Sequence, residues 1–207
     1  MTITLEALDL KKVFERRTIF RNISFLMSEG QSLVVTGRNG SGKSTLLKIL
    51  AHVLTPTEGS VKIFSGLHNL SHSSHLHIGF VAPYLTLYEE FSGKENLQFA
   101  LAVRGLAQDA ALIDRLLDRF SLGGFKHAPA RVFSSGMKQR LKFAFALVHR
   151  PPVLLLDEPM ANLDTDGINQ VRELMTEHRK DGVLVVATND ISDAVIPDFV
   201  VDLNVSR

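Results

Sequence analysis

Residues 31–44 read QSLVVTGRNGSGKS, and this stretch decides the fold class. The apolar run before Gly37 predicts a short buried strand, and the segment KSTLLKILAHVL that begins at Lys43 predicts a helix. The apolar stripe of that helix would consist of Leu46, Leu47, Leu50, Val53 and Leu54. Between strand and helix, GRNGSGKS (Gly37 to Ser44) matches G-x-x-x-x-G-K-[ST] in full, in the context that a phosphate-binding loop requires.

The chemistry of phosphate binding explains the residue types in this loop. Glycines let the backbone curl so that successive N–H groups point at phosphate oxygens, and the amino end of the helix adds positive potential. Lys43 would supply a mobile charge for the β- and γ-phosphates, and Ser44 would offer a hydroxyl to Mg²⁺. The loop therefore predicts a nucleotide site. Its predicted nucleotide-binding residues are Gly37, Arg38, Asn39, Gly40, Ser41, Gly42, Lys43, Ser44 and Thr45.

A second buried run, VLLLDEP from Val153 to Pro159, ends in two adjacent carboxylates. A buried carboxylate is costly unless a cation or a hydrogen-bond network receives it. With a phosphate loop in the same chain, Asp157 is predicted to reach Mg²⁺ together with Ser44. Glu158, one residue later, is predicted to polarise the attacking water as the catalytic base. The alternative is that one carboxylate caps a helix while the other is solvated.

The order of the expected elements indicates an α/β fold. Early strands such as ITLEALDL (residues 3–10) alternate apolar and polar residues and predict an antiparallel lobe. Strands alternate with helices at both ends of the chain and predict a parallel sheet, up to a closing strand FVVDLNV at residues 199–205. The middle, 84–150, has helical periodicity alone. We therefore expect a single domain, with 1–83 and 151–207 as the nucleotide-binding core with its β-lobe and 84–150 as an inserted helical subdomain.

The bulk composition excludes several classes of protein. The chain has no cysteine, so disulfides, thiolate metal sites and cysteine nucleophiles are absent. Its net charge of +1 is not the strongly basic charge that is typical of nucleic-acid-binding proteins. The longest apolar runs are about half a dozen residues, far short of the roughly 20 that span a bilayer. Four histidines between His68 and His77 predict a polar surface loop; within it, His75 and His77 could share a strand face.

The stretch VFSSGMKQRLKFAFALVHRPPVLLLDEPMANLD, residues 132–164, resembles the region from signature motif to D-loop of ATP-binding cassette (ABC) ATPases. The resemblance covers nearly the whole chain and implies a P-loop NTPase (RecA-like) core. FSSGM stands where that family usually has L-S-G-G-Q: Ser134 and Gly136 match, whereas Ser135 and Met137 depart. The resemblance implies a head-to-tail homodimer with two ATP molecules between the subunits. It adds Phe14, Ser134, Ser135, Gly136 and Asp164 to the nucleotide-binding residues, with Phe14 stacking on adenine.

Two departures from the family pattern bear on catalysis. Pro83 aligns with a Gln that usually contacts the metal and the attacking water, and proline has no side-chain acceptor. Asn189 stands where a His usually contacts the γ-phosphate. Asn can donate a hydrogen bond but cannot carry a positive charge, so it would stabilise transition-state charge less well. We therefore assign catalytic roles to Glu158, Lys43 and Asn189 and expect tight ATP binding with slow hydrolysis.

The resemblance implies an ATPase subunit of an ABC transporter that docks on a separately encoded transmembrane permease. It would work as a cytoplasmic, peripheral protein on the inner face of the cell membrane, with PYLTLYEEF (residues 83–91) near the groove for the permease. The chain is similar in size to the ATP-binding subunit of the cytochrome c maturation haem exporter. The alternative is a scaffold that dimerises on ATP with vestigial hydrolysis; Pro83 and Asn189 favour it, and Glu158 argues against it.

Overall fold

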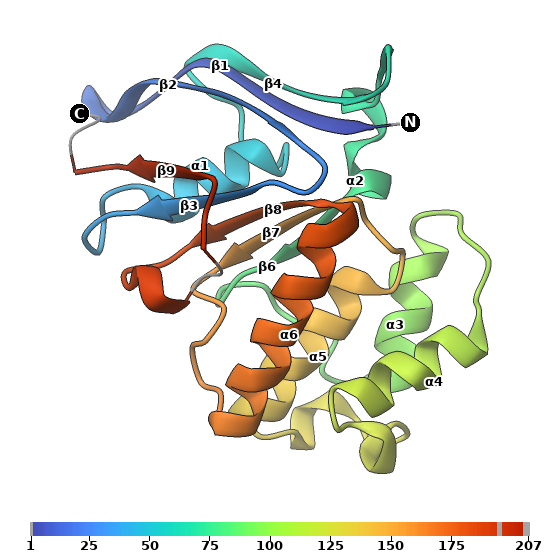
Figure 1. Ribbon diagram of the computed structural model, residues 1–207. Helices are drawn as coiled ribbons and strands as arrows, with labels where there is room; N and C mark the ends of the chain where they lie inside the picture. Colours follow the sequence, from blue (N-terminus) through green and yellow to red (C-terminus); the bar gives the residue numbers. More distant parts are fainter. Residues whose placement is uncertain (1, 194–195, 205–207) are drawn as a thin grey trace.

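The computed structural model describes residues 2–193 and 196–204 and contains two sheets with helices between and beside them (Figure 1). The larger sheet is five-stranded and parallel, in the order β6-β7-β8-β3-β9. Its strands are β3 (Ser32–Thr36), β6 (Ile78–Val81), β7 (Val153–Asp157), β8 (Val183–Ala187) and β9 (Phe199–Asp202). The α/β class with a parallel core is therefore confirmed. The final residue of the expected closing strand, residue 205, lies outside the described residues.

The parallel sheet separates two hydrophobic cores, because alternate residues of each buried strand point to opposite faces. On β7, Leu154 and Leu156 join the core beneath the helices, whereas Val153 and Leu155 join the core on the side of the antiparallel lobe. These four side chains are fully buried. The helices that contribute to the first of these cores are α3 (Gly93–Ala102), α4 (Ala110–Arg119), α5 (Ser135–Leu147) and α6 (Thr165–Asp181).

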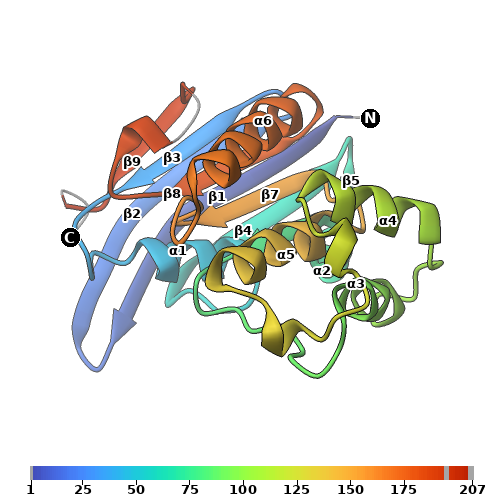
Figure 2. The same ribbon diagram turned by 90° about the horizontal axis from the view of Figure 1, so that it is seen from below.

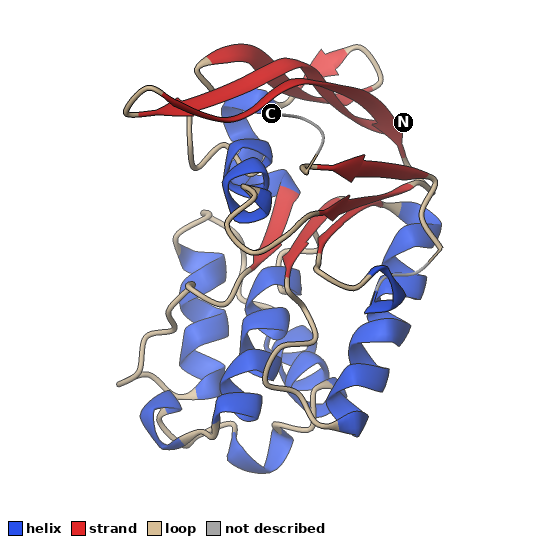
Figure 3. Cartoon of the chain, turned by 90° about the vertical axis from the view of Figure 1, so that its left-hand side faces the viewer, coloured by secondary structure: helices blue, strands red, loops and turns tan. Residues whose placement is uncertain are grey.

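The antiparallel lobe covers the other face of the parallel sheet and encloses α1 (Lys43–Leu50) between the two sheets (Figure 3). Its strand order is β2-β1-β4-β5. The strands are β1 (Ile3–Phe14), β2 (Arg17–Ser28), β4 (Glu58–Ser65) and β5 (His68–Asn69). The predicted early antiparallel strands are thus present, and they cover one side of α1.

The segment 84–150 contains no strand among its described residues, as the sequence predicts. Its helices begin at polar caps: Ser92 and Glu95 form a capping box on α3, and the Asp109 carboxylate accepts from Leu112 N–H on α4. Short 3-10 turns at Gly123–Phe125 and Ala130–Val132 connect α4 to α5. Seen from below, α3 and α4 lie to one side of the parallel sheet (Figure 2). No helix in the described ranges is long and apolar enough to cross a bilayer.

Two local expectations were wrong. The stripe on α1 does not extend to Val53, because the helix ends at Leu50 and His52 takes a left-handed conformation with φ of 57°, which leaves Val53 69% exposed. The histidine segment is not a plain loop, because β5 is followed by a 3-10 turn (Ser71–Ser73) and the helical turn α2 (Ser74–His77). His75 and His77 therefore share no strand face. A further 3-10 turn spans Ile191–Asp193.

Candidate functional site

The phosphate loop runs from the carboxyl end of β3 to the amino end of α1, where Ser44 and Thr45 occupy the first turn. Gly42 caps the helix with φ of 112°, a conformation that L residues rarely adopt. A Cβ on Gly42 would lie 2.4 Å from the Ile19 side chain of β2. The antiparallel lobe thus packs directly on the loop, and only glycine fits at this contact. Arg38, Asn39 and Gly40 are exposed at the tip of the loop.

Lys43 is at the centre of a compact polar cluster. Its side chain is only 6% exposed, and its Nζ donates to Gly37 O at 2.9 Å and to Asn189 Oδ1 at 2.5 Å. Glu158 Oε1 lies 3.4 Å from the same nitrogen, so the two residues form an ion pair. Asn189 Nδ2 also donates to Asn39 Oδ1 at 2.8 Å. The fold therefore brings the three predicted catalytic residues, Lys43, Glu158 and Asn189, into one site.

Asp157 ends β7 as a fully buried carboxylate. Neither of its oxygens has a hydrogen bond of standard geometry to any described residue. Burial raises the pKa of this carboxyl, while the nearby Ser44 hydroxyl and the charges of Lys43 and Lys48 lower it in part. A buried carboxylate with free oxygens beside a serine hydroxyl fits a hard divalent cation, so the side chains of Asp157 and Ser44 suit Mg²⁺.

Glu158 is the first residue after β7 (Val153–Asp157). Its φ of 47° is left-handed, and its N–H donates to Ala187 O of β8 at 2.8 Å. The change in backbone direction places the two adjacent carboxylates in different surroundings, one fully buried and the other 30% exposed. A partly exposed carboxylate beside Lys43 is a reasonable position for a base that activates water.

The signature residues lie apart from the phosphate loop. Ser134 caps α5, its Oγ accepting from Met137 N–H at 3.2 Å, and Ser135 and Gly136 form the first turn. Figure 1 shows the amino end of α5 at the far end of the molecule from the loop before α1. Asp164 caps α6 by accepting from Gly167 N–H at 2.9 Å and pairs with Arg140 of α5. One chain thus holds two separate groups of predicted nucleotide-binding residues.

Phe14 is at the end of β1, where the hairpin turns into β2. Its ring is 44% exposed, and Lys12 Nζ lies 4.8 Å from the ring centroid. An exposed aromatic face on a lobe that contacts the phosphate loop is available for stacking on a nucleobase. The adenine contact of Phe14 stays a prediction.

Pro83 follows β6, and its surroundings include residues that sequence reasoning missed. Lys142 of α5 donates from Nζ to Pro83 O at 2.8 Å and to Ala82 O at 3.3 Å. Tyr84 packs its ring beneath the Lys48 ammonium group of α1. Lys142 and Lys48 could be recognised in the sequence only as charged residues on amphipathic helices. Their contacts with Pro83 O and with the Tyr84 ring could not be predicted from that pattern.

Comparison with known proteins identifies the family. The family model described as ABC transporter matches residues 20–161. The chain belongs to the ABC transporter family. Within this family it is an ATP-binding subunit, similar to the lantibiotic transport ATP-binding protein SrtF of Streptococcus pyogenes, with 33% identity over 95% of this chain and 85% of the relative. The cytochrome c biogenesis ATP-binding export protein CcmA of Methylococcus capsulatus is 39% identical over 84% of each chain.

Solved structures support the same fold for this ABC subunit. The dimeric post-hydrolysis state of the ATP-binding cassette MJ0796 bound to ADP and Pi superposes with a TM-score of 0.81. At 24% identity it covers 92% of this chain and 90% of its own. An ATP-binding subunit of an ABC transporter gives a TM-score of 0.79 at 27% identity, with 91% and 80% of the two chains covered. The P-loop NTPase fold predicted from the sequence is therefore confirmed.

Proposed function

We propose that this ABC subunit binds and hydrolyses ATP with Mg²⁺ and thereby powers a separate membrane subunit. The observation that carries the proposal is the cluster around Lys43, in which Glu158 and Asn189 meet the phosphate loop beside the buried Asp157. In this reading Lys43 and the loop hold the phosphates, and Ser44 and Asp157 hold the metal, which neutralises phosphate charge when bound. Glu158 takes the proton of the attacking water.

A head-to-tail homodimer completes the proposed site. Ser134, Ser135 and Gly136 open α5 with backbone N–H groups suited to an anion, but they lie apart from the phosphate loop of their own chain. A second copy can bring its signature residues and Asp164 to the nucleotide on the first. The dimeric state of the cassette MJ0796 with ADP and Pi supports this arrangement.

Asn189 and Pro83 support slow turnover. The Asn189 side chain bridges Lys43 and Asn39, so it stands at the phosphate loop without a charge to offer the transition state. Pro83 has no polar side-chain atom for the metal or for water. The same two residues favour the alternative, a scaffold that dimerises on ATP with vestigial hydrolysis, whereas the Glu158–Lys43 pair favours an active enzyme.

The purified chain alone is expected to hydrolyse ATP only with Mg²⁺ and at less than about 1 s⁻¹, the low end of the ordinary range for enzymes. Phosphate release with and without EDTA measures this, and size-exclusion chromatography with ATP measures dimerisation. Dimerisation on ATP with no Mg²⁺-dependent turnover, both alone and beside a membrane partner, would favour the scaffold. Turnover well above 1 s⁻¹ would contradict the expected slowness.

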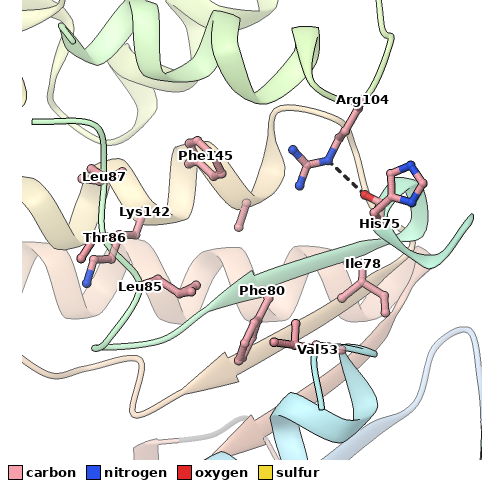
Figure 4. Close-up of a pocket in the computed structure, with 12 residues that line it drawn as sticks. Val53, His75, Ile78, Phe80, Leu85, Thr86, Leu87, Arg104, Lys142 and Phe145 are labelled. Carbon is pink, nitrogen blue, oxygen red and sulfur yellow. Dashed lines mark hydrogen bonds between the residues drawn. The ribbon is translucent and has the colours of Figure 1, made fainter. Parts of the chain in front are cut away.

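A cavity of about 260 Å³ supports docking of the membrane subunit (Figure 4). It lies beside β6 and α5, and its lining is mostly apolar, including Val53, Phe80 and Leu87. Lys142 and Arg104 add positive charge to this lining; the Arg104 side chain donates to His75 O at 3.0 Å (Figure 4). We propose that it receives an amphipathic helix of the permease that carries a carboxylate side chain. Docking there would hold this subunit at the inner face of the cell membrane.

Replacing Val53 with Asp is expected to weaken attachment to the permease at least tenfold, because it puts a negative charge on the exposed apolar rim. Leu67→Asp is the matched control, since Leu67 is fully exposed in the turn between β4 and β5. Co-sedimentation with membranes that contain a co-expressed candidate permease measures attachment. Equal loss or equal retention in the two variants would rule out this cavity as the docking surface.

The similarity to CcmA proteins supports an export role of the cytochrome c maturation type. Besides the Methylococcus protein, CcmA of Brucella abortus is 38% identical over 89% of this chain. SrtF, named for lantibiotic transport, covers more of this chain at 33% identity. We therefore propose haem export as the more specific function. Transport assays with a co-expressed permease would compare haem with a peptide as the cargo.

A further inference from the structure

The segment after β6 contains a residue that could position water at the metal site, a role for which Pro83 has no polar side-chain atom; this inference rests on the proposed ATP hydrolysis. Two sets of contacts fix the backbone of this segment. Lys142 Nζ donates to both Ala82 O and Pro83 O, and Leu85 N–H donates to Ala82 O at 3.2 Å to close a turn. Tyr84 lies inside this turn, so its side chain is carried on backbone fastened to α5.

Two side chains define where the Tyr84 ring lies. The Lys48 ammonium nitrogen is 4.0 Å from the ring centroid, a cation–π contact, and Phe80 meets the ring edge-on at 6.3 Å between centroids. Lys48 is four residues after Ser44 on α1, so the two side chains share a helix face. The ring therefore packs against the face of α1 that carries the candidate metal ligand.

The segment after β6 also leaves the sheet beside Asp157, because Val81 of β6 pairs with Leu156 of β7 in the parallel sheet. Burial raises the pKa of the Tyr84 hydroxyl, and the Asp157 carboxylate raises it further. The Lys48 charge in turn lowers the pKa of Asp157. A phenol hydroxyl can both donate and accept a hydrogen bond. Such a group can orient water, as the amide of a Gln side chain can.

We propose that the Tyr84 hydroxyl is a positioning residue for water at the metal site of Ser44 and Asp157, in place of the side chain lost at Pro83. The neighbouring residues suit this role. Lys48 and Phe80 fix the ring, and Lys142 fixes the turn.

Tyr84→Phe tests the hydroxyl alone, because phenylalanine keeps the ring contacts with Lys48 and Phe80. The expected result is an approximately tenfold rise in the Mg²⁺ concentration needed for half-maximal ATP hydrolysis, the usual cost of losing an outer-shell partner of a metal. Tyr88→Phe is the matched control: Tyr88 is the other tyrosine of the chain, stacks on Phe91 and meets Phe99 edge-on. It is expected to leave the Mg²⁺ requirement unchanged.

Adding Pro83→Gln to Tyr84→Phe provides a rescue. If Tyr84 fills the role lost at Pro83, the double variant should recover most of the lost Mg²⁺ response. A loss of packing would not be repaired by a glutamine one residue away. Failure of this rescue, together with equal Mg²⁺ requirements for Tyr84→Phe and Tyr88→Phe, would overturn the proposal.

A spectroscopic measurement keeps the test independent of turnover. The chain has two tyrosines and no tryptophan, so the Tyr88→Phe protein reports tyrosine fluorescence from Tyr84 alone. Adding Mg²⁺ to its ATP complex is expected to change this emission, and Asp157→Asn should remove the change. An emission that does not respond to Mg²⁺ overturns the inference. An inactive wild-type protein with a responsive Tyr84 would instead contradict the proposed hydrolysis and leave the Tyr84 assignment supported.

Discussion

Glu158→Gln is expected to lower ATP turnover by about 10²-fold or more while ATP binding is retained, the effect of removing a general base. Glutamine keeps the shape of the side chain but cannot take a proton from water. It also removes the negative charge that lies 3.4 Å from Lys43 Nζ, which leaves the lysine free for phosphate. The ATP-bound dimer should therefore persist, because the step that separates the subunits is blocked.

Phosphate release measures the loss of turnover, and size-exclusion chromatography in the presence of ATP measures the persistence of the dimer. Glu177→Gln is the matched control, since Glu177 is 57% exposed and pairs with Arg119 on the surface at 2.6 Å. It should behave as wild type. Unchanged turnover in Glu158→Gln would mean that another group activates the water. The arrangement around Lys43 would then serve nucleotide binding alone.

Asn189→His is expected to raise ATP turnover by about 10–10²-fold, because a single hydrogen-bond donor to the transition state can change the rate by a factor of this order. Asn189 is exposed and contacts both Lys43 and Asn39, so the larger ring has room at the phosphate loop. Histidine can carry a positive charge there. Because its ordinary pKa is about 6.5, the gain should increase as the pH falls from 8 toward 6.

Steady-state turnover across that pH range measures this gain. Asn169→His provides the control, since Asn169 is exposed on α6 outside the site. If Asn189→His and Asn169→His turn over equally, Asn189 does not limit hydrolysis, and the slow rate expected of the wild type would have to arise at Pro83. A gain in Asn189→His without any pH dependence would show that hydrogen bonding matters and charge does not.

Local patterns were sufficient for the phosphate loop and for the strand that ends at Asp157. Both depend on neighbours in sequence: glycines that permit the turn, a lysine and a serine at fixed spacing, and an apolar run long enough for a buried strand. The prediction of the C-terminal end of α1 failed, because a single residue can end a helix without interrupting the apolar pattern. The helix ends at Leu50 and His52 takes a left-handed conformation, although the apolar residues of the sequence continue beyond it.

The residue types of the candidate site could be predicted from the sequence, because each chemical role needs a particular side chain. Its geometry could not be predicted, because Lys43 is more than a hundred residues from both Glu158 and Asn189 along the sequence. The three side chains meet only when β3, β7 and β8 lie side by side. The same holds for Lys48 over Tyr84 and for Lys142 on Pro83 O. Residue identity was thus enough to predict a phosphate-binding loop and to indicate the family. Packing of α1 and α5 against the sheet decided which groups face one another, since contacts between distant segments have no counterpart in local periodicity.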